Sequence, residues 1–176
     1  GGLNYPNYDK TVSVISLSNF SIIKTIPVVE NPCLIGSYND QYVYIQSRGN
    51  YNDIPANFQK IDARTDEVVK TFDLEVQGFA VYQHKAYLYS YDYNTMSSWV
   101  KVMDLQTDQI SSNSFITDGT TLQTPYSITT NPLNGDVYIT DTYDYTVSGD
   151  VYCFGQDGKK KFSFGAGLNP CAIVFK

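Results

Sequence analysis

Tyrosine is the residue type in this chain that is best suited to binding another molecule. The sequence has 16 tyrosines among 176 residues, beside nine phenylalanines and one tryptophan. A tyrosine combines a large rigid ring with a hydroxyl group and has few bonds to immobilise, which suits it to binding surfaces. Several tyrosines stand among Asn, Asp and Gly, where turn formation explains the neighbours but not the ring. These candidate binding loops are residues 4–9, 48–53, 91–94 and 143–145.

The candidate ligand-binding residues are the aromatic, arginine and asparagine side chains of these loops and of two adjoining segments. They are Tyr5, Tyr8, Arg48, Tyr51, Asn52, Tyr91, Tyr93, Trp99, Tyr126, Tyr143 and Tyr145. Phe79 and Asn169 could join the same face from neighbouring connections. The alternative is that the rings cover the ends of a hydrophobic core or are inherited from a repeat, and that Trp99 is a packing residue.

Residues able to catalyse a reaction are scarce. The only histidine, His84, stands in an expected hairpin turn on the face opposite the candidate loops. No nucleophile elbow, zinc-protease helix or phosphate-cradling loop is present in the sequence. Asp141, Asp144 and Asp150 could gather around calcium, but their spacing matches no calcium loop. We therefore expect a protein that is not an enzyme, with no catalytic residue, no metal and no cofactor; a propeller lactonase or quinoprotein remains the enzymatic alternative.

Composition describes a globular domain with an acidic balance. Hydrophobic residues make up 42% of the chain, charged residues 17%, and the net charge is −6. The run 159–161 of three lysines adjoins a glycine turn, so we expect a solvated hairpin tip and no nucleic-acid partner. No apolar run approaches a membrane span, and the chain shows no signal peptide. Three cysteines give no disulfide framework, and Cys33 and Cys171 are expected to be small core residues.

A repeat with a period in the forties determines which elements must position the loops. The strand cores around Tyr44, Tyr87 and Tyr138 are separated by 43 and 51 residues. The tripeptide at 31–33 returns at 169–171, after 138 residues. Short strands repeating at this period, without a helical pattern, are typical of a β-propeller.

The fold class predicted is all-β: a β-propeller of four-stranded antiparallel blades, of which this chain is about half of a seven-bladed ring. We expect the outer two strands of one blade at 11–26, complete blades at 32–74, 77–116 and 124–164, and a closing innermost strand at 170–176. This gives 15 strands, which is not a multiple of four, so the missing N-terminal half of the same propeller is an expected partner. A self-contained four-bladed ring is the alternative.

The phrase from Asn7 to Ile15, together with the Asn-Pro corners and Val-Tyr-Ile strands, resembles the YVTN/YncE-type propeller repeat over essentially the whole chain. The loops rich in tyrosine and asparagine resemble those of the surface layer propellers of gut Bacteroidetes. That resemblance implies seven blades, a lipoprotein at the cell surface, anchored to the outer membrane or periplasmic, and capture of cobalamin for a TonB-dependent transporter. The repeat motif itself contains no ligand residues to carry over.

The sequence therefore favours a non-catalytic binding propeller at the cell surface, with cobalamin as the preferred ligand. A corrin with peripheral amides needs aromatic surface together with carboxamide and hydroxyl partners, and the four loops offer these groups. The alternative is a structural or adhesive surface-layer module that holds a protein or a glycan.

Overall fold

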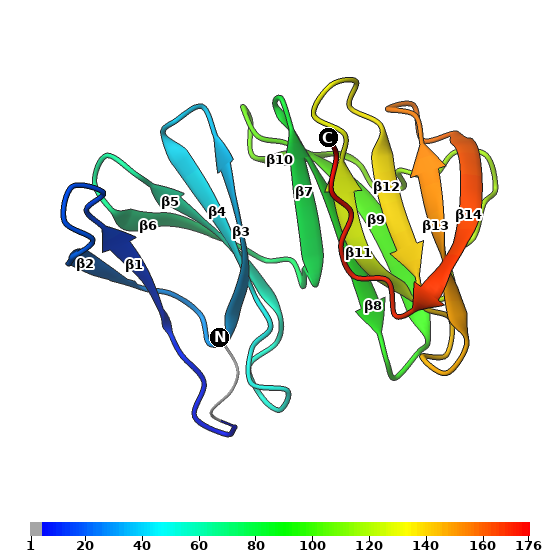
Figure 1. Cartoon of the computed structure of the whole chain (residues 1–176). Helices are drawn as coiled ribbons and strands as arrows, with labels where there is room; N and C mark the ends of the chain where they lie inside the picture. Colours follow the sequence, from blue (N-terminus) through cyan, green and yellow to red (C-terminus); the bar gives the residue numbers. More distant parts are fainter. Residues whose placement is uncertain (1–4) are drawn as a thin grey trace. The chain divides into compact units, whose positions relative to one another are not determined.

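The computed structural model describes residues 5–176, which form 14 strands and no helix (Figure 1). Asn4, the first residue of the first candidate loop, lies outside the described residues. The chain divides into two compact units, Gly1–Gln77 and Gly78–Lys176, which are considered in turn as unit 1 and unit 2. Within the described range, no helix exists that has the length and apolar character to cross a membrane.

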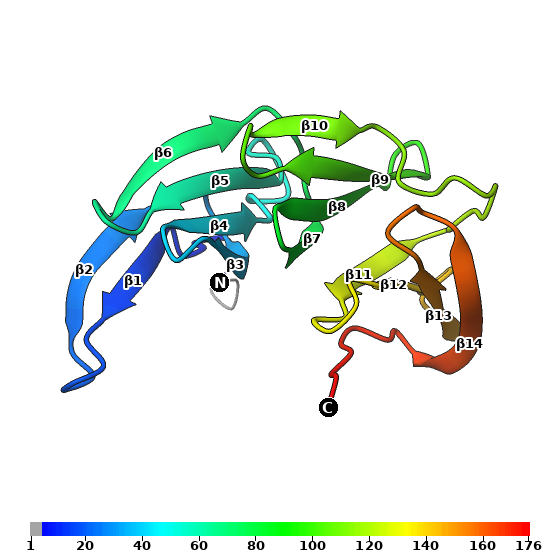
Figure 2. The same cartoon turned by 90° about the horizontal axis from the view of Figure 1, so that it is seen from above.

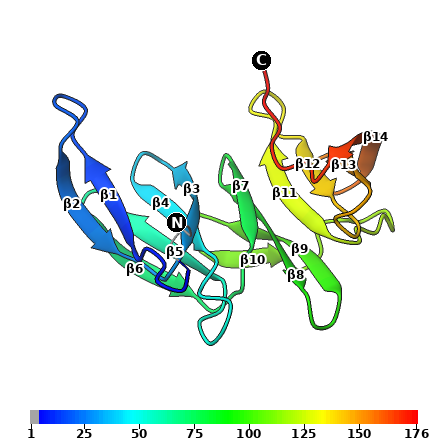
Figure 3. The same cartoon turned by 60° about the horizontal axis from the view of Figure 1, so that its bottom comes forward.

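Unit 1 contains a two-stranded hairpin and one four-stranded sheet, both antiparallel (Figure 3). The hairpin consists of β1 (Thr11–Ile15) and β2 (Ile22–Pro27). The sheet follows chain order: β3 (Pro32–Tyr38), β4 (Tyr42–Ser47), β5 (Asn57–Asp62) and β6 (Glu67–Phe72). Strands adjacent in sequence are thus adjacent in space, as in the blade of a propeller.

Branched aliphatic side chains hold the hairpin of unit 1 against its sheet. Ile26, Ile45 and Ile61 are buried together, and partly buried valines from β1, β4 and β6 surround them. Side chains alternate between the two faces of a strand. Residues an odd number of positions from Ile45 and Ile61 therefore point to the other face, where the rings of Tyr44 and Phe58 stack at 5.4 Å.

Unit 2 contains two four-stranded antiparallel sheets, again in chain order (Figure 2). The first comprises β7 (Gly78–Tyr82), β8 (Lys85–Asp92), β9 (Ser97–Asp104) and β10 (Gln109–Ser112). The second comprises β11 (Pro125–Thr130), β12 (Val137–Asp141), β13 (Ser148–Phe154) and β14 (Lys160–Leu168). Aromatic and aliphatic residues form the buried core: Tyr87, Tyr89, Val100, Val102, Phe115, Ile128, Val137, Ile139 and Phe154.

The turns between the first two strands of each sheet are tight and polar, as the sequence predicts. Positive φ values help the chain to reverse in all three: Asn39 and Asp40 in the loop 39–41, Gln83 in the two-residue loop 83–84, and Gly135 in the longer connection 131–136. His84 lies in the corresponding turn between β7 and β8. These turns are at the opposite end of the blade from the candidate loops, because the strands are antiparallel.

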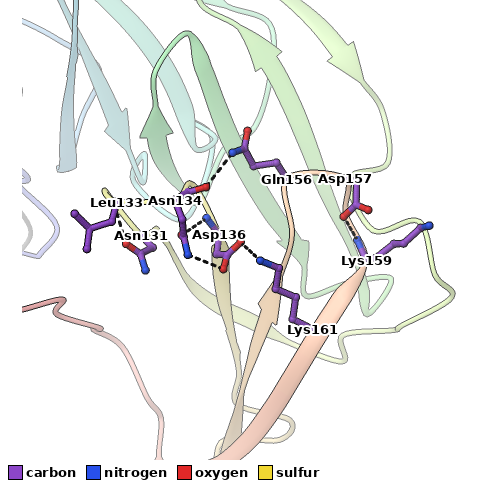
Figure 4. A network of polar contacts seen from close by, with 8 residues as sticks. All are labelled: Asn131, Leu133, Asn134, Asp136, Gln156, Asp157, Lys159 and Lys161. Atoms are coloured by element: carbon purple, nitrogen blue, oxygen red, sulfur yellow. Dashed lines mark hydrogen bonds and ion pairs between the residues drawn. The ribbon is translucent and has the colours of Figure 1, made fainter.

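The lysine run at 159–161 is part of a polar network at this turn end of the second sheet of unit 2 (Figure 4). Asp136 is buried and accepts from the Lys161 ammonium at 2.6 Å and from the Asn134 side-chain amide at 3.0 Å. The carboxylate raises the pKa of Lys161 through this hydrogen bond. The Gln156 side-chain amide donates to the Asn134 carbonyl at 3.0 Å, so this hydrogen bond joins the β13–β14 turn to the β11–β12 turn.

The predicted all-β fold of four-stranded antiparallel blades is confirmed, but two details are wrong. Residues 171–176 form no strand, because a strand requires a partner for its backbone groups and none of the described residues pairs with them. This segment returns toward β12, where the rings of Phe175 and Tyr138 lie 5.2 Å apart (Figure 1).

The second error concerns the cysteines that were expected in the core. Cys33 and Cys171 are both exposed and free, whereas Cys153 is buried. Cys33 stands at a register irregularity between Pro32 and Leu34, and its thiol faces the Asn31 side chain at 3.6 Å. A bulge of this kind turns a side chain away from the regular alternation. Cys171 follows the last strand, outside any sheet.

Candidate functional site

The candidate loops are the connections between the second and third strands of the sheets, together with the segment that precedes β1. They comprise residues 48–56 between β4 and β5, 93–96 between β8 and β9, and 142–147 between β12 and β13. Tyr91 belongs to β8 instead of to a loop, and its side chain is only 7% exposed. Apart from Tyr143, the predicted tyrosines gather into one patch within each unit.

The tyrosine patch of unit 1 consists of Tyr5, Tyr8 and Tyr51. The Tyr8 ring stands edge-on between the other two, with ring centroids 6.1 Å from Tyr5 and 5.9 Å from Tyr51. Tyr8 is buried, whereas Tyr5 and Tyr51 are 78% and 65% exposed. Tyr8 is therefore the packing residue of the patch, and the other two rings present their surfaces to solvent.

The loop that carries Tyr51 is organised by a single carboxamide. The Asn50 side-chain oxygen accepts from the backbone N–H groups of Asn52, Asp53 and Ile54, at 3.0, 3.1 and 2.9 Å. Gly49 has φ +68°, and a Cβ there would lie 2.0 Å from the Ile54 carbonyl oxygen, so only glycine fits.

The predicted polar residues of this loop, Arg48 and Asn52, both have exposed side chains. The Arg48 backbone N–H donates to the Asn31 carbonyl at 2.9 Å, which fastens the start of the loop to the connection before β3. The Asn52 side-chain amide donates to Asp53 at 3.4 Å.

The tyrosine patch of unit 2 consists of Tyr91, Tyr93, Tyr126 and Tyr145. The rings of Tyr91 and Tyr93 are perpendicular at 4.8 Å, and those of Tyr126 and Tyr145 are nearly so at 5.9 Å. The hydroxyl groups of Tyr93 and Tyr145 share a hydrogen bond of 2.8 Å. Tyr93 is 59% exposed and Tyr91 is buried, so this patch also has an exposed layer above a packed one.

Tyr89 is not among the candidate residues of the sequence, but it bonds to the backbone of Tyr126, a member of this patch. Its ring lies over Gly78, where a Cβ would be 2.3 Å from the ring. Its hydroxyl donates to the backbone carbonyl of Tyr126 and so fixes the start of β11. The glycine opposite an aromatic residue in a neighbouring strand was the sequence signal for this arrangement.

A buried carboxylate organises the loop that carries Tyr143 and Tyr145. Asp141 is 1% exposed and accepts from three backbone N–H groups: Gln123 at 2.7 Å, Thr124 at 2.8 Å and Tyr143 at 3.0 Å. The Thr124 hydroxyl donates to the Tyr143 carbonyl at 2.6 Å. Asp141 therefore joins two chain segments that come from different connections.

Tyr143 turns away from the patch, contrary to the expectation that all the loop tyrosines share one surface. Its hydroxyl donates to Asp150, and the Tyr152 hydroxyl lies 3.3 Å from it. Asp144 instead caps its own loop through the backbone N–H groups of Thr146 and Val147. The three aspartates that were considered for calcium thus have separate hydrogen-bonding roles, and among residues 5–176 no group of three His, Cys, Asp or Glu side chains could hold a metal ion.

Three loop tyrosines have backbone conformations that tyrosine rarely adopts. Tyr51, Tyr143 and Tyr145 have φ values of +59°, +54° and +68°. This left-handed region favours Gly and Asn, and a bulky residue there costs about 1–2 kcal/mol. Phe20 and Met96 share this conformation in other turns, so what distinguishes Tyr51 and Tyr145 is that their rings also contact further tyrosines.

The environment of Tyr8, Tyr143 and Tyr145 raises the pKa of each of these phenols. Burial, followed by the hydrogen bond with Tyr93, raises the pKa of Tyr145. Burial also raises the pKa of Tyr8, with contributions from Tyr51 and Tyr5. For Tyr143 the hydrogen bond to Asp150 is the main cause of a raised pKa. These phenols are therefore neutral hydrogen-bond donors and acceptors in neutral solution.

Three of the remaining candidates do not join a patch. Trp99 is half-buried in β9, with the Lys101 ammonium 4.7 Å above its ring. Phe79 is buried in β7. Asn169 follows β14 with φ +51°, and its side-chain oxygen is buried. The packing interpretation fits Phe79, whereas Trp99 lines a groove of about 560 Å³ beside the patch.

No family model matches this chain, and no curated protein matches its sequence. Solved structures do resemble it. Hydrazine synthase of Kuenenia stuttgartiensis has a TM-score of 0.71 and 12% identity, over 90% of this chain and 44% of that one. The Dos1 propeller has a TM-score of 0.63 and 13% identity, over 89% and 43%. The nidogen/laminin complex has a TM-score of 0.58 and 15% identity, over 90% and 58%.

These likenesses show the fold: the chain is part of a β-propeller built from four-stranded blades. The chain spans about half the length of the solved structures that it resembles. At 12–15% identity the similarity carries no ligand or activity with it.

Proposed function

We propose that this chain is a non-catalytic binding module in which each tyrosine patch, taken by itself, offers a surface for a ligand. The observation that carries the proposal is the left-handed backbone of Tyr51 and Tyr145, a backbone conformation that by itself favours Asn or Gly over tyrosine. The first ring is exposed, and the second is joined through its hydroxyl to exposed Tyr93.

Cobalamin is the ligand that we propose to test first. The proposal rests on the resemblance to the surface layer propellers and on the chemistry of the patches. Perpendicular ring pairs offer both ring faces and ring edges, and the neutral hydroxyl groups can pair with peripheral amides. In this proposal the protein acts at the cell surface, anchored to the outer membrane or in the periplasm, and delivers cobalamin to a TonB-dependent transporter.

We also propose that further blades of the same propeller adjoin unit 1. β1 pairs only with β2, whereas the corresponding strands β5, β9 and β13 each pair on both edges. Ile15, Ile22 and Ile23 of this hairpin are 50%, 64% and 66% exposed. An unpaired strand edge beside apolar side chains is suited to receive another strand.

The alternative function is a structural or adhesive module that holds a protein or a glycan through the same patches. It is favoured by the exposure of Tyr5, Tyr51 and Tyr93, because exposed aromatic side chains are common in protein interfaces. The two functions differ in whether a small molecule binds.

The test compares cobalamin binding, by isothermal titration calorimetry, between the chain and its Tyr93→Ala/Tyr145→Ala variant. We expect binding to the parent chain and a loss of affinity of roughly tenfold or more in the variant. Phe20→Ala is the matched control, because Phe20 is 80% exposed in the turn between β1 and β2, away from the candidate loops.

Absence of cobalamin binding in the parent chain would eliminate the preferred ligand and leave the adhesive alternative. Equal affinity for cobalamin in the parent chain, the Tyr93→Ala/Tyr145→Ala variant and the Phe20→Ala control would eliminate the tyrosine patch of unit 2 as the cobalamin-binding surface.

A further inference from the structure

A groove of about 560 Å³ lies beside the tyrosine patch of unit 2 and plays no part in the function proposed above. It opens between the first half of β9 and the connection that leads to β11. Its volume is within the range of roughly 300–1,000 Å³ that is typical of small-molecule sites. Met96 marks the border with the patch, because the Tyr91 hydroxyl donates to its sulfur at 3.0 Å.

The groove exists because one connection between blades is unusually long. The connections that precede β3 and β7 are residues 28–31 and 73–77, whereas residues 113–124 precede β11. Twelve residues without regular structure are more than the crossing requires, and long ordered loops of this kind are usually functional. Both ends of the segment, 113–116 and 120–123, line the groove.

This long connection is fixed along its length. Phe115 is buried in the core of unit 2. The Thr117 N–H and hydroxyl donate to the carbonyls of Gly158 and Asp157 at 3.0 and 2.9 Å. Asp118 accepts from the Lys160 N–H at 2.7 Å, and the last two residues are held by Asp141. The groove wall is therefore preorganised, which reduces the entropy lost when a ligand binds.

The chemistry of the lining is neutral and polar. Among the described residues that line the groove, none has a charged side chain, although the chain carries a net charge of −6. Hydroxyl groups come from Ser98, Thr120 and Thr121, and carboxamides come from Asn113 and Gln123. Hydroxyl and carboxamide groups both donate and accept hydrogen bonds, which matches a ligand that is itself rich in hydroxyl groups.

We propose that this groove is a preformed binding site for a neutral saccharide. The Lys101 ammonium is already placed over the ring of the lining residue Trp99, and no lining side chain is itself charged, whereas sugar hydroxyl groups can exchange water for the hydroxyl and amide groups of the lining. Val100, Ile116 and Leu122 supply apolar surface for the C–H groups of a sugar ring. The site is independent of the proposed ligand of the tyrosine patches.

In the experiment, the ¹⁵N-labelled 176-residue chain is titrated with cellobiose, maltose or N,N′-diacetylchitobiose. Binding is measured from the changes in the backbone amide chemical shifts. At least one of these probes is expected to shift the signals of residues 113–123 with a dissociation constant of about 1 mM or tighter. The Asn113→Ala/Gln123→Ala variant should weaken that binding by roughly tenfold, because it removes both carboxamides and leaves the backbone bonds to Asp141 in place. Gln106→Ala/Gln109→Ala is the matched control, since it removes two exposed carboxamides elsewhere on the same unit.

Three results would overturn the proposal: no shift at 113–123 with any of the three disaccharides, equal affinity in the Asn113→Ala/Gln123→Ala variant, or equal affinity for glucuronic acid. The Tyr93→Ala/Tyr145→Ala variant should keep its response to the disaccharide. The saccharide proposal is therefore tested by the Asn113→Ala/Gln123→Ala variant, and the proposal for the tyrosine patch is tested separately by the Tyr93→Ala/Tyr145→Ala variant.

Discussion

The loops that present the two tyrosine patches differ in what holds them. In unit 1 the Asn50 carboxamide accepts three backbone N–H groups that all lie within four residues of it. In unit 2 the buried Asp141 carboxylate also accepts three, but two of them belong to residues 123 and 124 on another connection. The first loop is a local turn, and the second is a tertiary junction.

This difference indicates how much each patch depends on the rest of its unit. A local turn keeps its shape when neighbouring segments change, because its hydrogen bonds close within the loop. A junction couples the segments that it joins. Asp141 holds both the loop that carries Tyr145 and the end of the long connection that lines the groove. The patch of unit 2 should accordingly be the more rigid and the more easily damaged of the two.

Removing the two anchors should have the largest effect. Asp141→Ala leaves three backbone N–H groups without their charged acceptor, so we expect a loss of about 3 kcal/mol in the free energy of unfolding. Asn50→Ala removes neutral, partly solvated bonds and should cost about 1 kcal/mol. Urea denaturation followed by circular dichroism measures both.

Asp141→Asn serves as the control, because it retains one acceptor oxygen and should fall between these values. Equal losses of stability for Asp141→Ala and Asn50→Ala would show that hydrogen bonds between two connections stabilise unit 2 no more than the hydrogen bonds within one loop stabilise unit 1.

Acid should loosen the long connection of unit 2 and spare the Asn50 turn. Hydrogen bonds from the Lys160 and Thr120 N–H groups lower the pKa of Asp118 from 3.8 to about 2. Because the folded pKa is below the unfolded one, this contribution to stability is complete above about pH 4 and is lost as the pH falls toward 2. The amide shifts of residues 120 and 160 should titrate with a midpoint near 2.

In the Asp118→Asn variant the same two amide signals should not titrate in this range. A midpoint at 3.8 or above in the parent chain would mean that the carboxylate does not hold the connection. Asp53 also titrates in acid, but its protonation leaves the three bonds to Asn50 in place.

Replacing the strained tyrosines by asparagine should give opposite signs in the two units. Tyr51→Asn relieves the left-handed backbone and loses only one ring contact, so we expect a gain of about 0.5–1 kcal/mol. Tyr145→Asn loses the Tyr126 contact and the Tyr93 hydroxyl as well, so we expect a loss of about 1 kcal/mol. Thermal unfolding measures both, and gains in both variants would contradict the proposed rigidity of the second patch.

The smallest effect is expected from the hydroxyl pair itself. Tyr93→Phe removes an exposed hydrogen bond and should change the free energy of unfolding by less than about 0.5 kcal/mol. Since that bond contributes to the raised pKa of Tyr145, the Tyr145 phenol should ionise at lower pH in the variant. An ultraviolet difference titration detects the shift, and an unchanged titration would show that the pair does not form in solution.

Sequence periodicity was sufficient for the blades because a strand core such as Val137-Tyr138-Ile139 encodes burial and pairing locally. It was insufficient at 170–176, where the residues resemble a strand but pairing depends on a partner strand. It did not reveal the role of Asp141, which was considered only for calcium, because the distant backbone N–H groups that bond to this carboxylate belong to another connection. Tyr89 was not selected, although the glycine opposite it in the neighbouring strand was a usable signal. The grouping of tyrosines within each unit followed from equivalent positions in the repeat, whereas the outward turn of Tyr143 depended on Asp150, seven residues away.

The three cysteines also give the folded molecule a chemical signature. Cys33 in unit 1 and Cys171 in unit 2 are open to solvent, and Cys153 is enclosed in β13. A maleimide reagent should therefore alkylate two cysteines per native chain, and the third cysteine only when β13 unfolds. The stoichiometry of alkylation thus reports the integrity of the last sheet directly, with no engineered label.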